Sequence, residues 1–269
     1  MNEIIAVTEN DLKLTQHFIA YFDILGYKKH VQIHGDNTKF AKSICDTITT
    51  VEKSLRWRND SSKNKYGYDL KLKVFSDNFI ICSESNWYYV IAYVNTLQLF
   101  LIRDNIFIRG ALYYGDLHFH EHFIYGQGII DTYDIESQIA IFPRVVVNDK
   151  FIDAAKNVVS TNSDSTHKAN SDDILSSVLA SITDDFDGCK FADYLKFAYW
   201  RFVQSKNDDT SNALFLKVLS LHQENITKNI KNNVSNMRIL QKYQWCKNYH
   251  NNFCKKYKYT DYIIKDLEV

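Results

Sequence analysis

The sequence predicts an α+β fold in which helices lie against a mainly antiparallel sheet, close to the βαββαβ arrangement. An apolar strand pattern, "FIAYF" at residues 18–22, is followed by a segment with helical periodicity. A second pattern, "LKLKVFSDNFIICS" at residues 70–83, folds back on itself around a Ser-Asp-Asn corner. A long apolar segment at residues 87–102 then leads to another strand pattern. In order, these patterns give strand, helix, hairpin, helix and strand.

The bulk composition favours a substantial folded unit. The 269 residues are 45% hydrophobic and 14% aromatic, which is enough to bury a large core. No linker separates independent domains, so we expect one structural unit with two parts. The first part is a core over residues 1–150. The second, over residues 151–269, is a loop plus a mainly helical extension that packs on the core.

Charge and cysteine content argue against several classes of protein. Lys+Arg and Asp+Glu balance at 32 each, so no global field attracts nucleic acid or a membrane surface. The five cysteines form no CxxC pair and no signal peptide is recognisable, which indicates reduced thiols in the cytoplasm. No apolar run approaches the about 18 residues that a spanning helix needs. We therefore expect a cytoplasmic protein that binds neither nucleic acid nor membrane.

Helical spacing follows the first strand, where apolar side chains recur every three or four residues. These side chains are Ile44, Ile48, Val51 and Leu55. The elements expected in the first half are a strand over 18–22, a helix over 40–57, a polar loop over 58–69, a hairpin over 70–83 and a helix over 87–102.

The second half begins with β-branched and aromatic strand patterns and ends with long helical ones. A polar, low-complexity stretch separates the two. The expected elements are strands over 106–117, 123–125 and 144–148, a helix over 126–142, a loop over 157–173, a further element over 174–182, a turn over 184–188, and helices over 191–203 and 212–257.

Two acidic residues occupy corners of the predicted sheet. Asp23 follows the first strand directly, and Asp77 lies at the tip of the hairpin. Taken singly, Asp23 reads as a helix N-cap and Asp77 as a turn residue. Because the first strand and the hairpin would be neighbours, the two carboxylates are expected to converge. Two carboxylates together with substrate phosphates form a usual magnesium site, so we interpret the pair as metal ligands.

A set of short motifs resembles the class III nucleotidyl cyclases. "FDILGY" at residues 22–27 resembles their first metal motif, and "KVFSDNFII" at residues 73–81 resembles their second. "IRGALYYGDL" and "YGQGIIDTYDIES" occupy the places of the next strand and of the following helical segment. Together with "FPRVVV" and "KYQWCKNYHN", the set is closest to the bacterial antiphage pyrimidine cyclases of Pycsar systems. The resemblance covers most of the chain and makes residues 1–150 a ferredoxin-like cyclase catalytic core.

The resemblance implies a site built around two divalent ions, Mg²⁺ or Mn²⁺. The residues implied to hold the ions are Asp23, Ile24 and Asp77. Backbone amides at the start of the first helix would hold the triphosphate, and two further residues would line the base pocket. These substrate-binding residues are Ile24, Leu25, Gly26, Tyr27, Lys73 and Phe123.

Departures from the motifs of purine-specific cyclases indicate a different substrate base and a different cationic residue for transition-state stabilisation. Phe123 stands where purine cyclases have an adenine-reading Asp, and a smaller, differently polar pocket fits a pyrimidine better. Ile130 and Asp134 stand where those enzymes have a ribose-orienting Asn and a transition-state Arg. Phosphoryl transfer needs a cation facing the developing charge, and Arg109 and Arg144 are the catalytic candidates.

The function implied by the resemblance is synthesis of a second messenger in antiphage defence. UTP, or alternatively CTP, would be converted to its 3′,5′-cyclic monophosphate and pyrophosphate. The family's sites lie between two subunits, so a head-to-tail homodimer is expected. The cyclic nucleotide would activate a separate effector, without direct contact between the two proteins.

Two rival functions remain open from the sequence. The first is a degenerate cyclase-fold protein that binds nucleotide or a partner without turnover, which the missing Asn and Arg favour. The presence of both acids speaks against it. The second is a polymerase-palm or diguanylate-cyclase-like enzyme, although the GG[DE]EF-type hairpin is absent.

Three other clusters have both a functional and a structural interpretation. His118, His120 and His122 have transition-metal spacing on an extended strand, yet fall at a hairpin connection where polar residues are ordinary. A second cluster recurs every four residues and is more consistent with packing or an interface than with a metal site. Its members are Cys246, His250 and Cys254. Aromatic residues of the same helix form either a packing stripe or a contact with a partner subunit. They are Tyr243, Trp245 and Tyr249.

Overall fold

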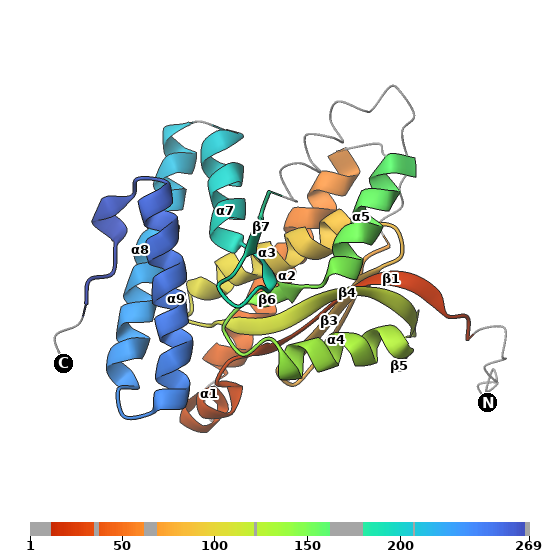
Figure 1. Ribbon diagram of the computed structural model, residues 1–269, viewed down its shortest axis with the longest axis horizontal. Coiled ribbons are helices and arrows are strands. Elements are labelled where there is room, and N and C mark those ends of the chain that lie inside the picture. The colour runs from red at the N-terminus through yellow and green to blue at the C-terminus, as the bar shows by residue number, and fades with distance from the viewer. Residues whose placement is uncertain are drawn as a thin grey trace.

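The computed structural model describes residues 12–34, 38–61, 69–120, 123–161, 180–206 and 208–266. The expected α+β class is confirmed, since helices cover a mixed sheet whose strand order is β2-β3-β1-β4-β6-β8-β7, with β5 paired to β4 (Figure 1). The strands are β1 (Thr15–Ile24), β2 (Lys71–Phe75), β3 (Asn78–Ser83), β4 (Ile108–Phe119), β5 (Ile124–Tyr125), β6 (Val145–Val147), β7 (Ile182–Asp184) and β8 (Lys190–Ala192).

The helices of the first 161 residues lie on both faces of this sheet. They are α1 (Tyr27–His34), α2 (Lys39–Ser61), α3 (Trp87–Ile102), α4 (Gln127–Gln138) and α5 (Asp149–Thr161). Figure 1 shows α2, α3 and α5 on one face and α4 on the other. In the described part of the chain, no helix is long and apolar enough to cross a membrane.

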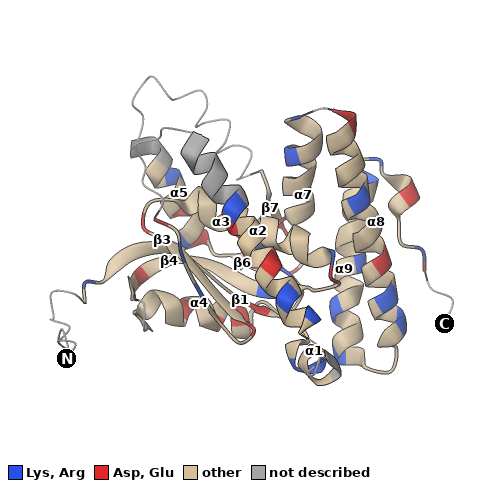
Figure 2. Ribbon diagram, turned by 180° about the vertical axis from the view of Figure 1, so that it is seen from behind, with Lys and Arg blue, Asp and Glu red and all other residues tan. Residues whose placement is uncertain are grey.

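The C-terminal helices pack side by side at the flank of the sheet (Figure 1). They are α7 (Tyr194–Tyr199), which continues as a π-helical turn (Trp200–Gln204), α8 (Asp209–Asn232) and α9 (Met237–Lys256), followed by a 3₁₀ turn (Thr260–Tyr262). Their apolar cluster includes Ile102 at the end of α3 and Phe107 before β4. The extension therefore shares buried surface with the first part of the chain. Most charged positions along α8 and α9 are basic, and the acidic ones, Asp209 and Glu224, both belong to α8 (Figure 2).

The central strand β1 explains the layering. It is antiparallel to both β3 and β4, so the first four strands have the order β2-β3-β1-β4 of a βαββαβ unit. Alternate residues of a strand point to opposite faces. Phe18, Phe22 and Ile24 enter the main apolar core beneath α3. Tyr21 and Asp23 occupy the alternate positions and therefore lie on the face that α4 covers.

The structure corrects several predicted boundaries. Residues 149–161 form α5, so the loop expected from residue 157 begins too early, and residues 162–179 lie outside the described residues. The helix expected over 191–203 begins only at Tyr194, because Lys190–Ala192 pairs with β6 and β7 as β8. Asp193 caps that helix by accepting a hydrogen bond from the Lys196 amide. The helical span expected over 212–257 is interrupted between α8 and α9.

The hairpin turn also differs in detail from the expectation. Asp and Asn tolerate a positive φ more readily than Ser, yet Ser76, with φ 58°, is the residue of the turn in the left-handed region. Asp77 keeps an ordinary negative φ and connects directly to β3. The turn therefore places the Asp77 backbone beside the end of β1, where its carbonyl accepts from the Ile24 amide.

Gly110 sits where β4 passes closest to β1, opposite Phe22. An added Cβ would collide with the Phe22 side chain and with the backbone of Tyr21 and Phe22. We expect Gly110→Ala to lower the free energy of unfolding by about 3 kcal/mol, measured by urea denaturation. Gly188→Ala is the comparison: its Cβ meets nothing within 4 Å but φ is +81°, so the expected loss is only about 1 kcal/mol. Equal losses for the two variants would contradict the close approach at Gly110.

Candidate active site

Asp23 and Asp77 meet at one corner of the sheet. Asp23 lies opposite Asn78 in the β1–β3 ladder, and the Ile24 amide donates to the Asp77 carbonyl at 3.1 Å. The Asn78 side chain donates to the Asp77 carboxylate at 3.1 Å and accepts from the Tyr21 hydroxyl at 2.6 Å. The end of β1 and the hairpin tip are thus joined by backbone and side-chain hydrogen bonds.

Arg109 faces this corner from β4, directly across the ladder from Asp23. Its Nε lies 3.1 and 3.2 Å from the two carboxylate oxygens of Asp23, and its Nη2 lies 3.0 Å from Oδ2. This two-pronged geometry is the strong form of an arginine–carboxylate pair. Both side chains are half-buried, so water screens the pair only in part. The sequence proposed Arg109 for catalysis, and the structure brings it to Asp23.

Glu136 of α4 is a third acid at the corner, which the sequence reasoning missed. Its Oε1 lies 2.9 Å from Arg109 Nη2, and the charge of Asp23 acts on its carboxyl. Burial, followed by the negative charge of Asp23, raises the pKa of Glu136 to about 7. The available signal was helical spacing, because Glu136 shares the inward face of α4 with Gly128 and Thr132.

Lys242 reaches the same region from α9. Burial and then the charge of Arg109 lower its pKa, while Asp23 and Glu136 act in the opposite direction. Burial, followed by Glu136 and Asp23, likewise raises the pKa of Tyr21 to about 12. The C-terminal extension therefore contributes charge to the corner, which the sequence did not indicate.

Two of the four backbone amides proposed to bind phosphate already donate hydrogen bonds to carbonyls of this chain. The Ile24 amide donates to Asp77, and the Leu25 amide donates to the Phe107 carbonyl at 2.9 Å. Gly26 and Tyr27 come next, at the N-terminus of α1, where backbone amides lack helical acceptors. Gly26 has φ +73°, a conformation that suits glycine and turns the chain into the helix. A phosphate group would therefore find its donors at Gly26 and Tyr27.

Lys73 and Phe123 lie together beside the end of β4. The Lys73 ammonium group is 3.4 Å from the His120 carbonyl, and the Phe123 ring is 5.7 Å from the rings of His118 and His120. Lys73 pairs with Ile80, two positions along β3 from Asn78. Of the three histidines considered for a metal, His122 lies outside the described residues.

Arg144 has a different environment from Arg109. Its side chain is fully buried, forms ion pairs with Asp185 and Asp187, and lies over the rings of Phe142 and Trp245 at 5.4 and 5.9 Å. These contacts tie the start of β6 to the β7–β8 turn and to α9. With both acids already engaged and no exposed surface, Arg144 has a structural environment, and Arg109 is the arginine that faces the acidic corner.

The residues at the corner fit a substrate-assisted metal site better than a preformed one. Within the described ranges, no group of three or more His, Cys, Asp or Glu side chains is arranged to hold a metal ion. Mg²⁺ in phosphoryl-transfer sites needs only one or two carboxylates, because substrate phosphates and water supply the remaining oxygens. Asp23 and Asp77 would supply these carboxylates. Asp23 would then have to release Arg109 in order to bind the metal ion.

Comparison of the sequence with protein-family models and with curated proteins finds no match. The functional assignment therefore depends on the chemistry of this corner and on the arrangement of its residues.

Cys246, His250 and Cys254 are buried, and His250 belongs to a hydrogen-bonded chain between helices. His250 Nε2 donates to the Tyr262 carbonyl at 2.7 Å, so its Nδ1 accepts from His222 Nδ1 at 3.0 Å. His222 Nε2 is then the acceptor for the Tyr194 hydroxyl at 2.8 Å. Burial lowers the pKa of both histidines, so both are neutral. This arrangement supports the packing interpretation.

Glu136 should make stability depend on pH. Its carboxyl keeps a proton up to a pKa of about 7 in the folded protein, compared with 4.5 ordinarily. The stability it contributes is therefore present below pH 4.5 and is lost as the pH rises through 7. Because Gln cannot ionise, we expect Glu136→Gln to gain up to about 3 kcal/mol relative to the wild type between pH 5 and pH 8.

Urea denaturation of both proteins at the two pH values, with a chelator present, measures this difference. Ser137→Ala, an exposed change on the same helix, should give a difference from the wild type that does not vary with pH. A constant difference for Glu136→Gln as well would contradict the raised pKa of Glu136.

Proposed function

We propose that the chain is a class III-type pyrimidine nucleotide cyclase that converts UTP or CTP to the 3′,5′-cyclic monophosphate and pyrophosphate. The observation that carries this proposal is the corner itself. Asp23 and Asp77 lie side by side at the end of β1 and the tip of the β2–β3 hairpin, with Arg109 facing Asp23. The antiparallel order β2-β3-β1-β4 supports it, because it is the order expected for a cyclase core.

Each residue at the corner has a role in the proposed reaction. The ribose 3′ oxygen attacks the α-phosphorus, its proton passes to solvent, and the bond from that phosphorus to the bridging oxygen of pyrophosphate breaks. Asp23 and Asp77 would hold Mg²⁺ or Mn²⁺, which would stabilise the charge on the phosphates and the leaving pyrophosphate. The amides of Gly26 and Tyr27 would bind the triphosphate. Lys73 and Phe123 would face the base.

Arg109 and Glu136 would act together. In the free protein, Arg109 binds both oxygens of Asp23 while its Nη2 also lies 2.9 Å from Glu136. When Asp23 turns to the ions, Glu136 would keep one side of the guanidinium in place. The remaining N–H groups of Arg109 would then be available for the charge that develops on the phosphate.

A head-to-tail homodimer is part of the proposal. Large apolar side chains are exposed on the hairpin, on β5 and on α4, and such exposure is typical of an interface. They include Val74, Phe75, Tyr125, Ile130 and Tyr133. We expect light scattering to give twice the 31.5 kDa chain mass and Phe75→Glu to shift the protein to the monomer with loss of activity. An active monomer would contradict the shared site.

The proposal is tested by incubating the protein with each of the four nucleoside triphosphates and Mn²⁺, then separating the products. The expected main product is cyclic UMP or cyclic CMP together with pyrophosphate. Cyclic AMP as the main product would overturn the pyrimidine assignment. In a cell, the product would act in antiphage defence by activating a separate cytoplasmic effector.

A second candidate function has one observation in its favour. The bidentate contact of Arg109 occupies both oxygens of Asp23, as expected for a degenerate site that binds nucleotide or a partner without turnover. Calorimetry that detects nucleoside triphosphate binding without release of pyrophosphate would favour this function over the cyclase.

A further inference from the structure

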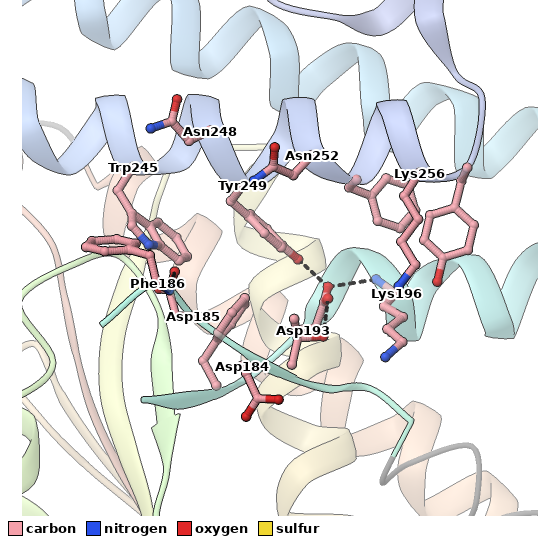
Figure 3. A pocket seen from close by; sticks show the side chains of 14 residues that line it. Asp184, Asp185, Phe186, Asp193, Lys196, Trp245, Asn248, Tyr249, Asn252 and Lys256 are labelled. Atoms are coloured by element: carbon pink, nitrogen blue, oxygen red, sulfur yellow. Dashed lines mark hydrogen bonds between the residues drawn. The ribbon is translucent and has the colours of Figure 1, made fainter. Parts of the chain in front are cut away.

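A pocket of about 430 Å³ lies in the C-terminal half, apart from the acidic corner. Its walls come from the β7–β8 turn, α7 and α9 (Figure 3). None of the corner residues Asp23, Asp77, Arg109 and Glu136 lines it. Its volume falls in the range of small-molecule sites, and it is about large enough for a nucleoside monophosphate.

The pocket has an aromatic floor that is rigid before any ligand enters. Trp245 and Tyr249 stack with ring centroids 5.4 Å apart, and Phe191 meets both rings edge-on. Trp245 Nε1 donates to Asp185 at 2.7 Å, and the Tyr249 hydroxyl donates to Asp193 at 2.6 Å. Trp245 and Tyr249 are only 5% and 8% exposed and stack on each other, so a planar ligand would contact the exposed edges of this floor. Because the rings are already fixed, that contact costs little entropy.

Two lysines lie together at one end of the pocket, opposite Trp245 and Asp185 (Figure 3). They are Lys196 from α7 and Lys256 from α9. Burial, together with the like charge of Lys256, lowers the pKa of Lys196, although Asp193 and Asp184 oppose this. Three carboxylates, those of Asp184, Asp185 and Asp193, also line the pocket. The oxygens of Asp193 accept from Tyr249, Thr183 and the Lys196 amide.

Neither ammonium group forms an ion pair with a carboxylate of the described residues. Lys256 has only a distant contact with the Tyr257 ring, at 5.8 Å. An anion placed between the two ammonium groups would be attracted by both, against the opposing charges of Asp193 and Asp184. Asn248 and Asn252, both exposed on α9, also line the pocket, and a carboxamide can donate or accept hydrogen bonds.

We propose that this pocket binds a planar aromatic small molecule bearing a phosphate, with its ring on the Trp245–Tyr249 floor and its anionic group between Lys196 and Lys256. A nucleoside monophosphate has this chemistry and size. The proposal is independent of the cyclase function, because it uses no residue of the acidic corner and requires no divalent ion.

The test is isothermal titration calorimetry of the full chain with UMP, CMP, AMP and GMP in the presence of a chelator. At least one of the four should bind, and the corresponding nucleoside and inorganic phosphate should each bind at least tenfold more weakly. Lys196→Met and Lys256→Met should each weaken binding at least tenfold. The matched control is Lys255→Met, the exposed neighbour that does not line the pocket, which should change binding less than twofold.

Three results would overturn the proposal. They are absence of binding by all four nucleotides, binding of inorganic phosphate as tight as that of the nucleotide, and unchanged binding in both lysine variants. The thermal unfolding midpoint of each variant shows that it is folded. Binding should persist in Asp23→Asn, and its loss there would place the nucleotide at the acidic corner instead. These binding measurements do not require cyclase activity, so they test the pocket even if the cyclase assay detects no product.

Discussion

Asp23→Asn is expected to reduce cyclic nucleotide formation roughly 100-fold to 1,000-fold, the scale observed when one electrostatic contact to a developing charge is removed. The amide of Asn has half the oxygen ligands of a carboxylate and no charge, so a divalent ion would be held weakly at the end of β1. Asp77→Asn should cause a loss of similar size, because both acids are proposed to hold the ions. Activity is measured as the initial rate of cyclic UMP or CMP formation with Mn²⁺.

The matched control for these variants is Asp46→Asn. Asp46 is exposed on α2, where it pairs with Lys42, and lies outside the corner. Its replacement should leave the rate unchanged. Asp23→Asn also leaves Arg109 within reach of Glu136, so the protein should remain folded by circular dichroism. A folded Asp23→Asn variant with more than half of the wild-type rate would overturn the metal-ligand role of Asp23.

Arg144→Met is expected to lower the free energy of unfolding by about 3 to 5 kcal/mol, as is usual when one partner of a buried ion pair is removed. The change leaves Asp185 and Asp187 without the cation that both contact. The Arg144 guanidinium beside Asp187 lowers the pKa of that carboxyl, so the variant should lose most stability at neutral pH, where the carboxyl is charged. Urea denaturation monitored by tryptophan fluorescence, with Trp245 in contact with this network, measures the effect.

Lys190→Met provides the comparison for Arg144. Lys190 pairs with Asp149 near the same turn, but this ion pair is largely exposed, so its removal should change the free energy of unfolding little. An Arg144→Met variant with the stability of the wild type but without activity would support the catalytic role predicted from the sequence and contradict the structural one.

The sequence predicted the structure best where a local residue pattern by itself determines the position of an element in the fold. The apolar run at residues 87–102 has the same bounds as α3, and the Ser-Asp-Asn corner is the turn of the β2–β3 hairpin. Asp23 and Asp77 could be placed together because each lies at the end of a strand, and neighbouring strands follow from the order of elements. A carboxylate at a strand end is visible in a sequence without knowledge of side-chain direction.

The arginines could not be told apart from sequence. Arg109 lies at the start of β4 and Arg144 directly before β6, and what distinguishes them is the direction of each side chain and its partners. Arg144 finds its acids 41 and 43 residues further along the chain, in a turn that no local pattern connects to it. Lys242 reaches the corner from a helix more than a hundred residues away from Arg109 for the same reason. Long-range pairing of charged side chains is decided by packing, not by local spacing.

Other misses had a local signal that competing features concealed. The apolar positions of α5 have helical spacing, but the following polar stretch made the segment resemble a loop. The run after residue 190 has strand and helix character in succession, and pairing with β6 decides that Lys190–Ala192 is a strand. The amides of Ile24 and Leu25 were assigned to phosphate because sequence does not show which carbonyls a turn already satisfies.

The chain of hydrogen bonds from Tyr194 through His222 and His250 to the Tyr262 carbonyl runs in one direction only. An extra proton on Nδ1 of His250 would set two donors against each other at the Nδ1–Nδ1 contact with His222. Since burial holds the pKa of both histidines below the ordinary 6.5, the stability they contribute is present above that pH and is lost on acidification. Acidification is therefore expected to weaken the packing of the C-terminal segment on α8 and α9.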